Sequence, residues 1–169
     1  NIFDNFLCKY NKLDTIIHFF ASNCKNLKVF ECFWEKIEAF VGDADKLRHI
    51  LLLEGSFMKN ALLHSIKHLN ETSFCYLFGH VYWKYFNIKV FASDMAEHGE
   101  NLLHKLAGIG TVPMFKFALE KLKNEFSAED FQNFIKMKNT SNHNILHCAF
   151  SNYKDEKLVE FLPSFIEHE

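Results

Sequence analysis

The stretch Leu102-Leu103-His104 places two aliphatic residues before a histidine, and this pattern occurs four times in the chain. The other copies are Ile16-Ile17-His18, Leu62-Leu63-His64 and Ile145-Leu146-His147. Their histidines follow one another at intervals of 40 to 46 residues. Recurrence at a near-regular spacing indicates an internal repeat, because each copy then marks the same point of a repeated unit.

Helical patterns flank each copy of the motif. An apolar group with helical spacing precedes the histidine, and a longer amphipathic stretch follows it, as in residues 29–37 and 114–122. The preceding groups are Phe3, Phe6 and Leu7; Leu47, Ile50 and Leu51; Phe131, Phe134 and Ile135; and, less clearly, Ile88, Val90 and Phe91. Each unit is therefore predicted to hold a short helix opened by the motif, a long helix and a third short helix. The units span about residues 14–58, 59–98, 99–141 and 142–169.

The long stretches of the second and fourth units carry further expectations. Residues 74–86 are apolar nearly all round, which predicts a helix buried on more than one side. The fourth long helix is expected from Leu158, Val159, Phe161, Leu162, Phe165 and Ile166.

Several residues are suited to the predicted helix boundaries. Asp43 and Ser127 are typical N-caps, and Pro113 fits the first turn of a long helix. Gly55 and Gly99 precede their histidine motifs, where the chain must reverse, and Gly108-Ile109-Gly110 predicts a tight turn between helices.

The composition agrees with an all-α fold of few or no strands. The 169 residues include 20 Phe but only 2 Pro and 6 Gly, too few to separate many short strands. A net charge of −2 without a basic stripe argues against nucleic acid as a partner. No apolar run is long enough for membrane insertion by this segment. Five cysteines without framework spacing indicate reduced thiols and a cytoplasmic location, with the nucleus as a second compartment.

These units resemble divergent, elongated ankyrin repeats of the arthropod type, whose signature T-P-L-H-x-A opens the first helix of a helix pair. Thr15-Ile16-Ile17-His18 keeps the Thr, an aliphatic residue and the His, and Ile145-Leu146-His147-Cys148-Ala149 keeps the Leu, His and Ala. The resemblance covers nearly the whole chain. No copy has the Pro, and an extra helix stands where an ankyrin repeat forms its hairpin. The resemblance implies an α-solenoid in one domain, residues 1–169. The other folds considered are a HEAT-like array and a compact helical bundle.

The resemblance also implies a function. Ankyrin-like arrays are non-enzymatic scaffolds that bind a protein partner on a concave face, through the residue before the motif and those four and five after its histidine. By position these are Asp14, Asn60, Glu100, His143, Ser22, Asn23, His68, Leu69, Gly108, Ile109, Ser151 and Asn152. The same resemblance gives His18, His64, His104 and His147 a structural hydrogen-bonding role.

More specific functions remain alternatives. They are an IκB-like inhibitor, viral or host, that binds Rel-type transcription factors, and the cytosolic ankyrin segment of a channel or toxin. Neither end resembles a polar cap, so the chain is expected to belong to a longer array.

Catalytic and cofactor sites are not expected. His64 and His68, like His143 and His147, have the spacing of two zinc ligands on one helix face, but neither pair has the glutamate of H-E-x-x-H. No Cys-x-x-Cys, nucleophile elbow or phosphate-binding glycine loop is present. A helical enzyme with a scattered active site is the remaining alternative.

Overall fold

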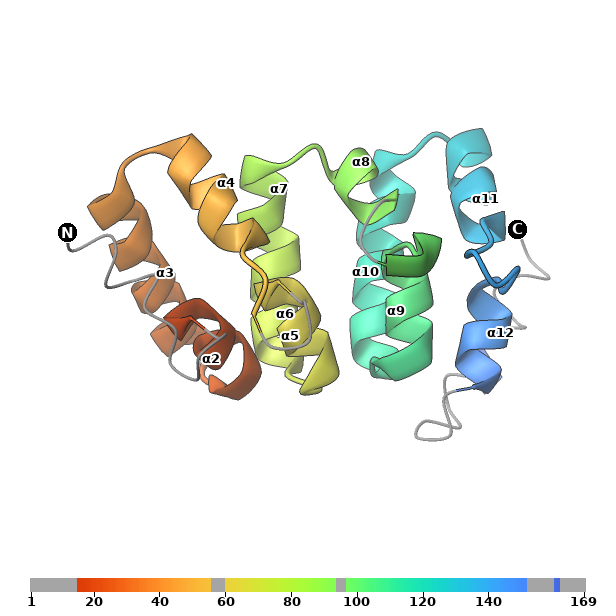
Figure 1. The fold of residues 1–169 in the computed structure, drawn as a ribbon, viewed down its shortest axis with the longest axis horizontal. Helices are drawn as coiled ribbons and strands as arrows, with labels where there is room; N and C mark the ends of the chain where they lie inside the picture. The colour runs from red at the N-terminus through yellow and green to blue at the C-terminus, as the bar shows by residue number, and fades with distance from the viewer. Residues whose placement is uncertain (1–14, 56–59, 94–96, 152–159, 162–169) are drawn as a thin grey trace. The chain divides into compact units, whose positions relative to one another are not determined.

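The computed structural model describes residues 15–55, 60–93, 97–151 and 160–161. Within these ranges the chain is all-α, with a single bridge residue, Glu100, in place of any strand. The helices form two compact units, residues 1–86 and 87–169, and each is described by itself (Figure 1). The boundary falls inside the segment 59–98, which the sequence pattern assigned to one repeat unit. None of the described helices has the length and apolarity needed to cross a membrane.

The first unit follows the predicted order of short, long and short helices. Its elements are α2 (Ile16–Asn23), α3 (Leu27–Val41), α4 (Ala44–Leu52), α5 (Ala61–Lys67), α6 (Glu71–Tyr76), the π-helical η1 (Leu77–Tyr82) and α7 (Trp83–Tyr85). The last three run on without a break and form the long helix expected over residues 74–86. Figure 1 shows α2 beside α5, with α3 and α4 continuing the chain from α2.

The second unit has the same order of short, long and short helices, after a short helix and a 3-10 turn. Its elements are α8 (Ile88–Ser93), the 3-10 turn η2 (Glu97–Gly99), α9 (Leu102–Ile109), α10 (Val112–Glu125), α11 (Ala128–Lys136) and α12 (Ile145–Phe150). The repeated order runs from α9 to α11. Helix α12 packs against α9, as α5 packs against α2 in the first unit. The apolar group of residues 3–7 lies outside the described residues, and so does the fourth long helix apart from residues 160–161.

Side-chain caps begin most of these helices. Asp43 accepts the backbone N–H of Lys46 at 2.8 Å, and Ser127 accepts that of Asp130 at 3.1 Å, so both predicted N-caps are confirmed. Pro113 lies in the first turn of α10, where a missing backbone N–H costs nothing. These residues start helices at the predicted places because each satisfies or removes a donor that the first turn leaves unpaired.

Glycine allows two of the helix ends. Gly42 ends α3 in the left-handed conformation, with φ of 61°. Gly110 forms the predicted turn between α9 and α10 for a different reason, because a Cβ there would lie 2.7 Å from the carbonyl oxygen of Leu106. The chain can turn this closely only where a side chain is missing.

Aromatic residues fill the core of the first unit. Fully buried side chains include Phe30, Trp34, Phe74, Phe78 and Tyr82. In the segment from α6 to α7 the buried positions recur every four residues, from Phe74 through Phe78 to Tyr82, and several residues between them are half-buried or exposed. The segment is therefore buried along one stripe, whereas the sequence pattern predicted burial on more than one side. Burying each such side chain contributes about 1.5 to 3 kcal/mol. The Tyr82 hydroxyl donates to the carbonyl of Leu51 at 2.8 Å, which ties η1 to α4, and burial raises the pKa of Tyr82.

The core of the second unit is more aliphatic. Its buried residues include Leu102, Leu103, Leu106, Met114, Phe115, Ala118, Leu122, Phe131 and Phe134. Helix α11 contributes the apolar group of residues 131–135 that the sequence pattern predicted to pack inward. Phenylalanines thus contribute to both cores, although others among the described residues, such as Phe19, Phe40 and Phe150, are exposed.

Candidate functional site

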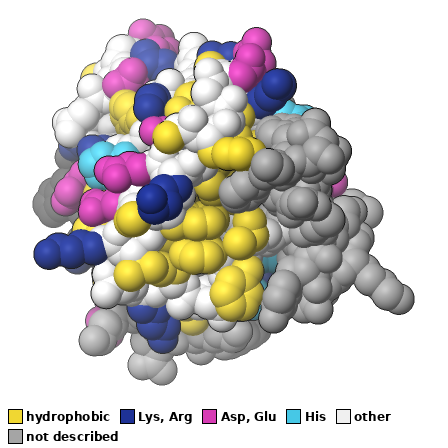
Figure 2. Space-filling model, turned by 90° about the vertical axis from the view of Figure 1, so that its left-hand side faces the viewer, with side chains coloured by type: hydrophobic (Ala, Val, Ile, Leu, Met, Phe, Trp, Pro, Cys, Tyr) yellow, Lys and Arg dark blue, Asp and Glu magenta, His cyan; other side chains and the backbone are white. Residues whose placement is uncertain are grey.

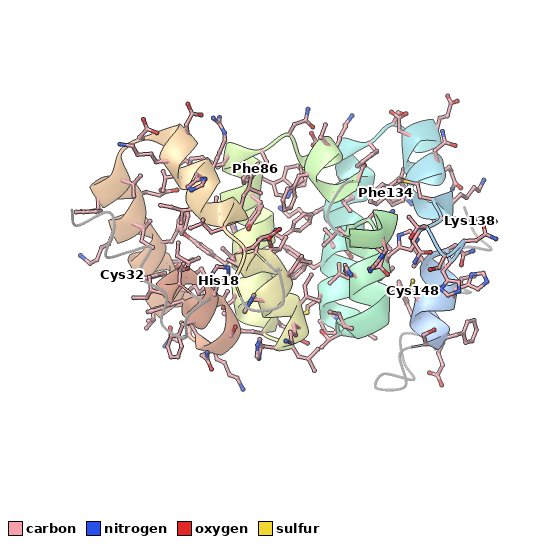
Figure 3. The ribbon with its side chains drawn as sticks, in the orientation of Figure 1. His18, Cys32, Phe86, Phe134, Lys138 and Cys148 are labelled. Atoms are coloured by element: carbon pink, nitrogen blue, oxygen red, sulfur yellow. The ribbon has the colours of Figure 1, made fainter. Side chains whose placement is uncertain are left out.

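His18 joins its own helix start to a distant segment of the first unit. Its Nδ1 lies 3.2 Å from the Thr15 backbone nitrogen, which donates to it, and 2.8 Å from the Thr15 hydroxyl. Its Nε2–H donates to the carbonyl of Leu53 at 2.9 Å. Figure 3 shows the buried ring between α2 and the segment that leads to α5. The imidazole therefore fixes the end of α4 to the beginning of α2.

His104 makes the same pair of connections in the second unit. Asn101 caps α9 by accepting the backbone N–H of His104 at 3.0 Å, and its own N–H points to Nδ1 at 3.4 Å. The Nε2–H donates to the carbonyl of His143, 3.2 Å away and directly before α12. Burial lowers the pKa of His104 and outweighs the opposing effects of the His143 carbonyl and the Glu100 carboxylate. Burial therefore favours the neutral form of the ring.

His147 repeats the cap but is exposed. Asn144 accepts its backbone N–H at 3.1 Å, and the Asn144 N–H lies 3.4 Å from Nδ1. Among the described residues, Nε2 of His147 has no hydrogen-bond partner.

His64 departs from the pattern by one position. Asn60 caps α5 by accepting the N–H of Leu63, so His64 is the fourth helical residue instead of the third. The cause is Ala61, which stands where the other copies carry Thr or Asn and has no side-chain acceptor. The buried His64 ring lies instead edge-on to His18, with centroids 4.8 Å apart.

Four of the predicted binding residues come together in the first unit. Ser22 and Asn23 end α2, and His68 and Leu69 follow the end of α5. Ser22 is half-buried and lies 3.4 Å from Nδ1 of His64, while the other three are exposed. We call these four residues the helix-end surface. It offers hydroxyl, amide and imidazole groups beside one exposed leucine.

Two buried residues that sequence reasoning missed hold this surface in place. The Asn70 amide donates to the carbonyls of Ala21 and Cys24, both at 3.0 Å. The Ser73 hydroxyl donates to the same Cys24 carbonyl at 2.9 Å. These bonds satisfy the last carbonyls of α2 and fix its end beside α6. The sequence signal that could have identified Asn70 is its place directly before the long helix that begins with α6. An asparagine that caps a helix through its side-chain oxygen still has its amide N–H groups to donate elsewhere.

The predicted residues at the helix starts lie elsewhere. Asn60 and His68 are at opposite ends of α5, whose seven residues span roughly 10 Å. In the second unit, the Glu100 carboxylate forms an ion pair with Lys105 and accepts from the Asn139 amide at 3.5 Å. Its neighbour His143 is exposed. The structure thus divides the predicted set between two ends of the helices.

The remaining predicted residues have mixed positions. Gly108 and Ile109 are half-buried at the end of α9, and Ser151 is exposed after α12, where its hydroxyl donates to the His147 carbonyl at 3.0 Å. Asp14 and Asn152 lie outside the described residues.

A carboxylate cluster in the first unit was not predicted. Glu38 of α3 accepts from Trp34 Nε1 at 2.7 Å, from the Tyr85 hydroxyl at 2.8 Å and from Lys84 Nζ at 3.1 Å. Burial acts to raise the pKa of Glu38, but the hydrogen bonds from Tyr85, Lys84 and Trp34 outweigh it and lower the pKa. The cluster joins α3 to α7 through charge-assisted bonds.

The paired histidines do not gather a third ligand. The rings of His143 and His147 stack with centroids 5.5 Å apart, and those of His64 and His68 lie 6.0 Å apart. No group of three or more metal-ligating side chains forms among the described residues. Within this part of the chain the cysteines are free thiols, and burial raises the pKa of Cys75 and Cys148.

Comparisons of the chain with protein-family models, with curated proteins and with solved structures give no match.

Proposed function

We propose that this chain is an array of ankyrin-like helical repeats that acts as a non-enzymatic scaffold, binding a protein partner in the cytoplasm. The observation that carries the proposal is the pair of connections made by His18 and His104. Each ring receives a backbone N–H of its own helix start and donates to a carbonyl 35 or 39 residues further on. A repeated role of this kind suits a structural element better than a catalytic one, because a reaction seldom needs the same residue in several places.

The helix-end surface is the best candidate for the contact. Asn23, His68 and Leu69 are exposed on neighbouring helix ends, and the bonds from Asn70 and Ser73 hold the backbone beneath them. A preorganised surface loses little conformational entropy when it binds, so a few polar contacts are enough for useful affinity. Its polar groups beside one leucine fit a protein surface of mixed polarity.

The test is capture of a partner by the immobilised full chain, followed by titration of the partner with two variants. His68→Ala combined with Asn23→Ala should weaken binding at least tenfold, equivalent to about 1.4 kcal/mol. Asn60 and Glu100 are unsuitable for this test, because one caps α5 and the other pairs with Lys105.

The matched control is His49→Ala, since His49 is also an exposed histidine in the last turn of a helix of the first unit. It should leave binding unchanged, and thermal unfolding should show that all variants are folded. Equal binding by the double variant and the parent chain would remove the helix-end surface from the proposal. Turnover of a substrate by the purified chain would contradict the scaffold function itself.

A further inference from the structure

The outer face of α2 and α3 is apolar and exposed. Figure 2 looks at this side of the first unit and shows hydrophobic side chains gathered in its middle, with charged side chains around them. Phe20 of α2 stacks on Phe33 of α3 with ring centroids 3.7 Å apart, which joins the two helices into one surface. The exposed apolar members include Ile16 and Phe19 of α2 and Val29 of α3, and Cys32 is exposed on the outer side of α3 (Figure 3). We call this surface the α2/α3 face.

Equivalent positions in other motif copies are covered. The second residue before the histidine is Leu62 in α5 and Ile145 in α12, and these side chains are 0% and 2% exposed. The corresponding residue of α2, Ile16, is 38% exposed. Helix α5 packs on α2 within the first unit, and α12 packs on α9 within the second. On α5 and α12 this position is buried, and both helices pack on the motif helix that precedes them in their unit. Helix α2 carries an apolar residue at the same position, but among the described residues no earlier motif helix covers it.

Helix α12 has the opposite property. The Nε2–H of His18 donates to the carbonyl of Leu53, which precedes α5, and that of His104 donates to the carbonyl of His143, which precedes α12. In both cases the acceptor comes before the helix that packs on the histidine's own helix. His147 has the same cap and an exposed ring, and Phe150 beside it is 60% exposed. Helix α12 thus presents the imidazole that in His18 and His104 binds a following segment, with one exposed apolar residue, Phe150, beside it.

We propose that two copies of this chain associate head to tail, with α12 of one copy docking on the α2/α3 face of the other. The contact continues the interface that each unit already contains between α2 and α5 or between α9 and α12. Since the two surfaces differ, the association is heterologous and can extend to further copies. The proposal does not depend on the helix-end surface or on its partner.

The test uses the full chain in sedimentation velocity over a range of concentrations. The weight-average mass should rise above that of one chain and continue past two. Val29→Glu should abolish this, because it places a carboxylate on the α2/α3 face. Val29 is the third residue of α3 after the cap Asn26, a position where Glu favours a helix, so the variant should fold. Phe150→Ser should abolish the association from the other end.

The control and the mixing experiment make the result specific. Val90→Glu also changes an exposed valine three residues after a capping asparagine, Asn87, and should associate like the parent chain. Val29→Glu and Phe150→Ser chains should each remain single, but their mixture should give a complex of two chains and no more, because one intact surface of each kind remains. A parent chain that stays single at every concentration, or a mixture that forms no pair, would overturn the proposal.

Thiol labelling gives a second measurement that needs no variant. Alkylation of Cys32, located by peptide mass spectrometry, should slow as the concentration of the parent chain rises, because Cys32 lies on the proposed contact. An unchanged labelling rate while the mass increases would place the association on another surface and overturn the proposal.

Discussion

Helices α9 and α12 begin with the same cap and differ in what covers them. Asn101 and Asn144 both accept the backbone N–H of the histidine three residues on, at 3.0 and 3.1 Å. His104 is 1% exposed and donates across to His143, whereas His147 is exposed. The local motif therefore sets the helix start, while the energetic importance of its histidine depends on the segment that packs on it.

The largest expected difference lies between the two histidines. His104→Ala should lower the free energy of unfolding by about 2 to 3 kcal/mol, because it removes a buried ring and one of the two donors to the His143 carbonyl, which also accepts the backbone N–H of Asn139. His147→Ala should cost less than about 1 kcal/mol, since the ring is exposed. Chemical denaturation of both variants measures the difference, and equal losses would contradict the role assigned to the covering segment.

The caps should show a smaller difference. Asn101→Ala removes the acceptor for His104 and also the amide donor to the Phe134 carbonyl at 3.2 Å, and should cost about 2 kcal/mol. Asn144→Ala should cost about 1 kcal/mol, the usual loss of a cap. Asn101→Asp is the informative control, because it keeps the acceptor but not the amide donor. If Asn101→Asp unfolds like the parent chain, the bond to Phe134 contributes nothing.

The end of α9 offers a matched glycine pair. A Cβ at Gly108 meets no atom within 4 Å, so Gly108→Ala should stabilise the helix by about 0.5 to 1 kcal/mol. Gly110→Ala should destabilise the fold by more than about 1 kcal/mol because of the contact with the Leu106 carbonyl. Thermal unfolding should move in opposite directions for the two variants. A shift of the same sign would show that the turn is less constrained than described.

The smallest effect is a dependence on pH. Burial lowers the pKa of His104 in the folded chain, so the unfolded chain binds the proton more tightly. The contribution of neutral His104 to stability is complete above the unfolded pKa of about 6.5 and falls as the pH drops below it.

Denaturation midpoints measured between neutral and mildly acid pH should therefore fall less steeply for His104→Asn than for the parent chain. Glu38 contributes to the pH dependence only at lower pH. Its pKa in the folded chain lies below its ordinary value, so its contribution to stability is lost as the pH falls through the folded pKa. Identical slopes for the two chains above pH 5 would show that His104 is protonated equally in the folded and unfolded states.

Much of the helical layout follows from local sequence patterns. The caps Asp43 and Ser127, the proline in the first turn of α10 and the turn at Gly110 are all local signals, and each was predicted from the residues around it. The third helices of the units were predicted from apolar spacing alone, because a buried helix face must repeat with the period of the helix.

The rest depends on contacts between distant residues. The capping shift at Asn60 was missed because the motif Leu62-Leu63-His64 matches the other copies, and only the cap chemistry at Ala61 moves the helix start. The Glu38 cluster was missed because two of its three donors, Lys84 and Tyr85, lie 46 and 47 residues away on α7. The positions of Asn60 and His68 at opposite ends of α5 follow from where this helix begins and ends, which the motif spacing alone does not give.

The most direct test of the account is the proton position on each histidine, measured by long-range ¹H–¹⁵N correlation NMR at neutral pH. His18 and His104 should each carry a single proton on Nε2, with slow exchange, because each ring is buried and donates this proton to a backbone carbonyl. His147 should exchange rapidly with solvent. Rapid exchange at all four histidines would contradict the claim that this motif joins neighbouring helical segments of the chain.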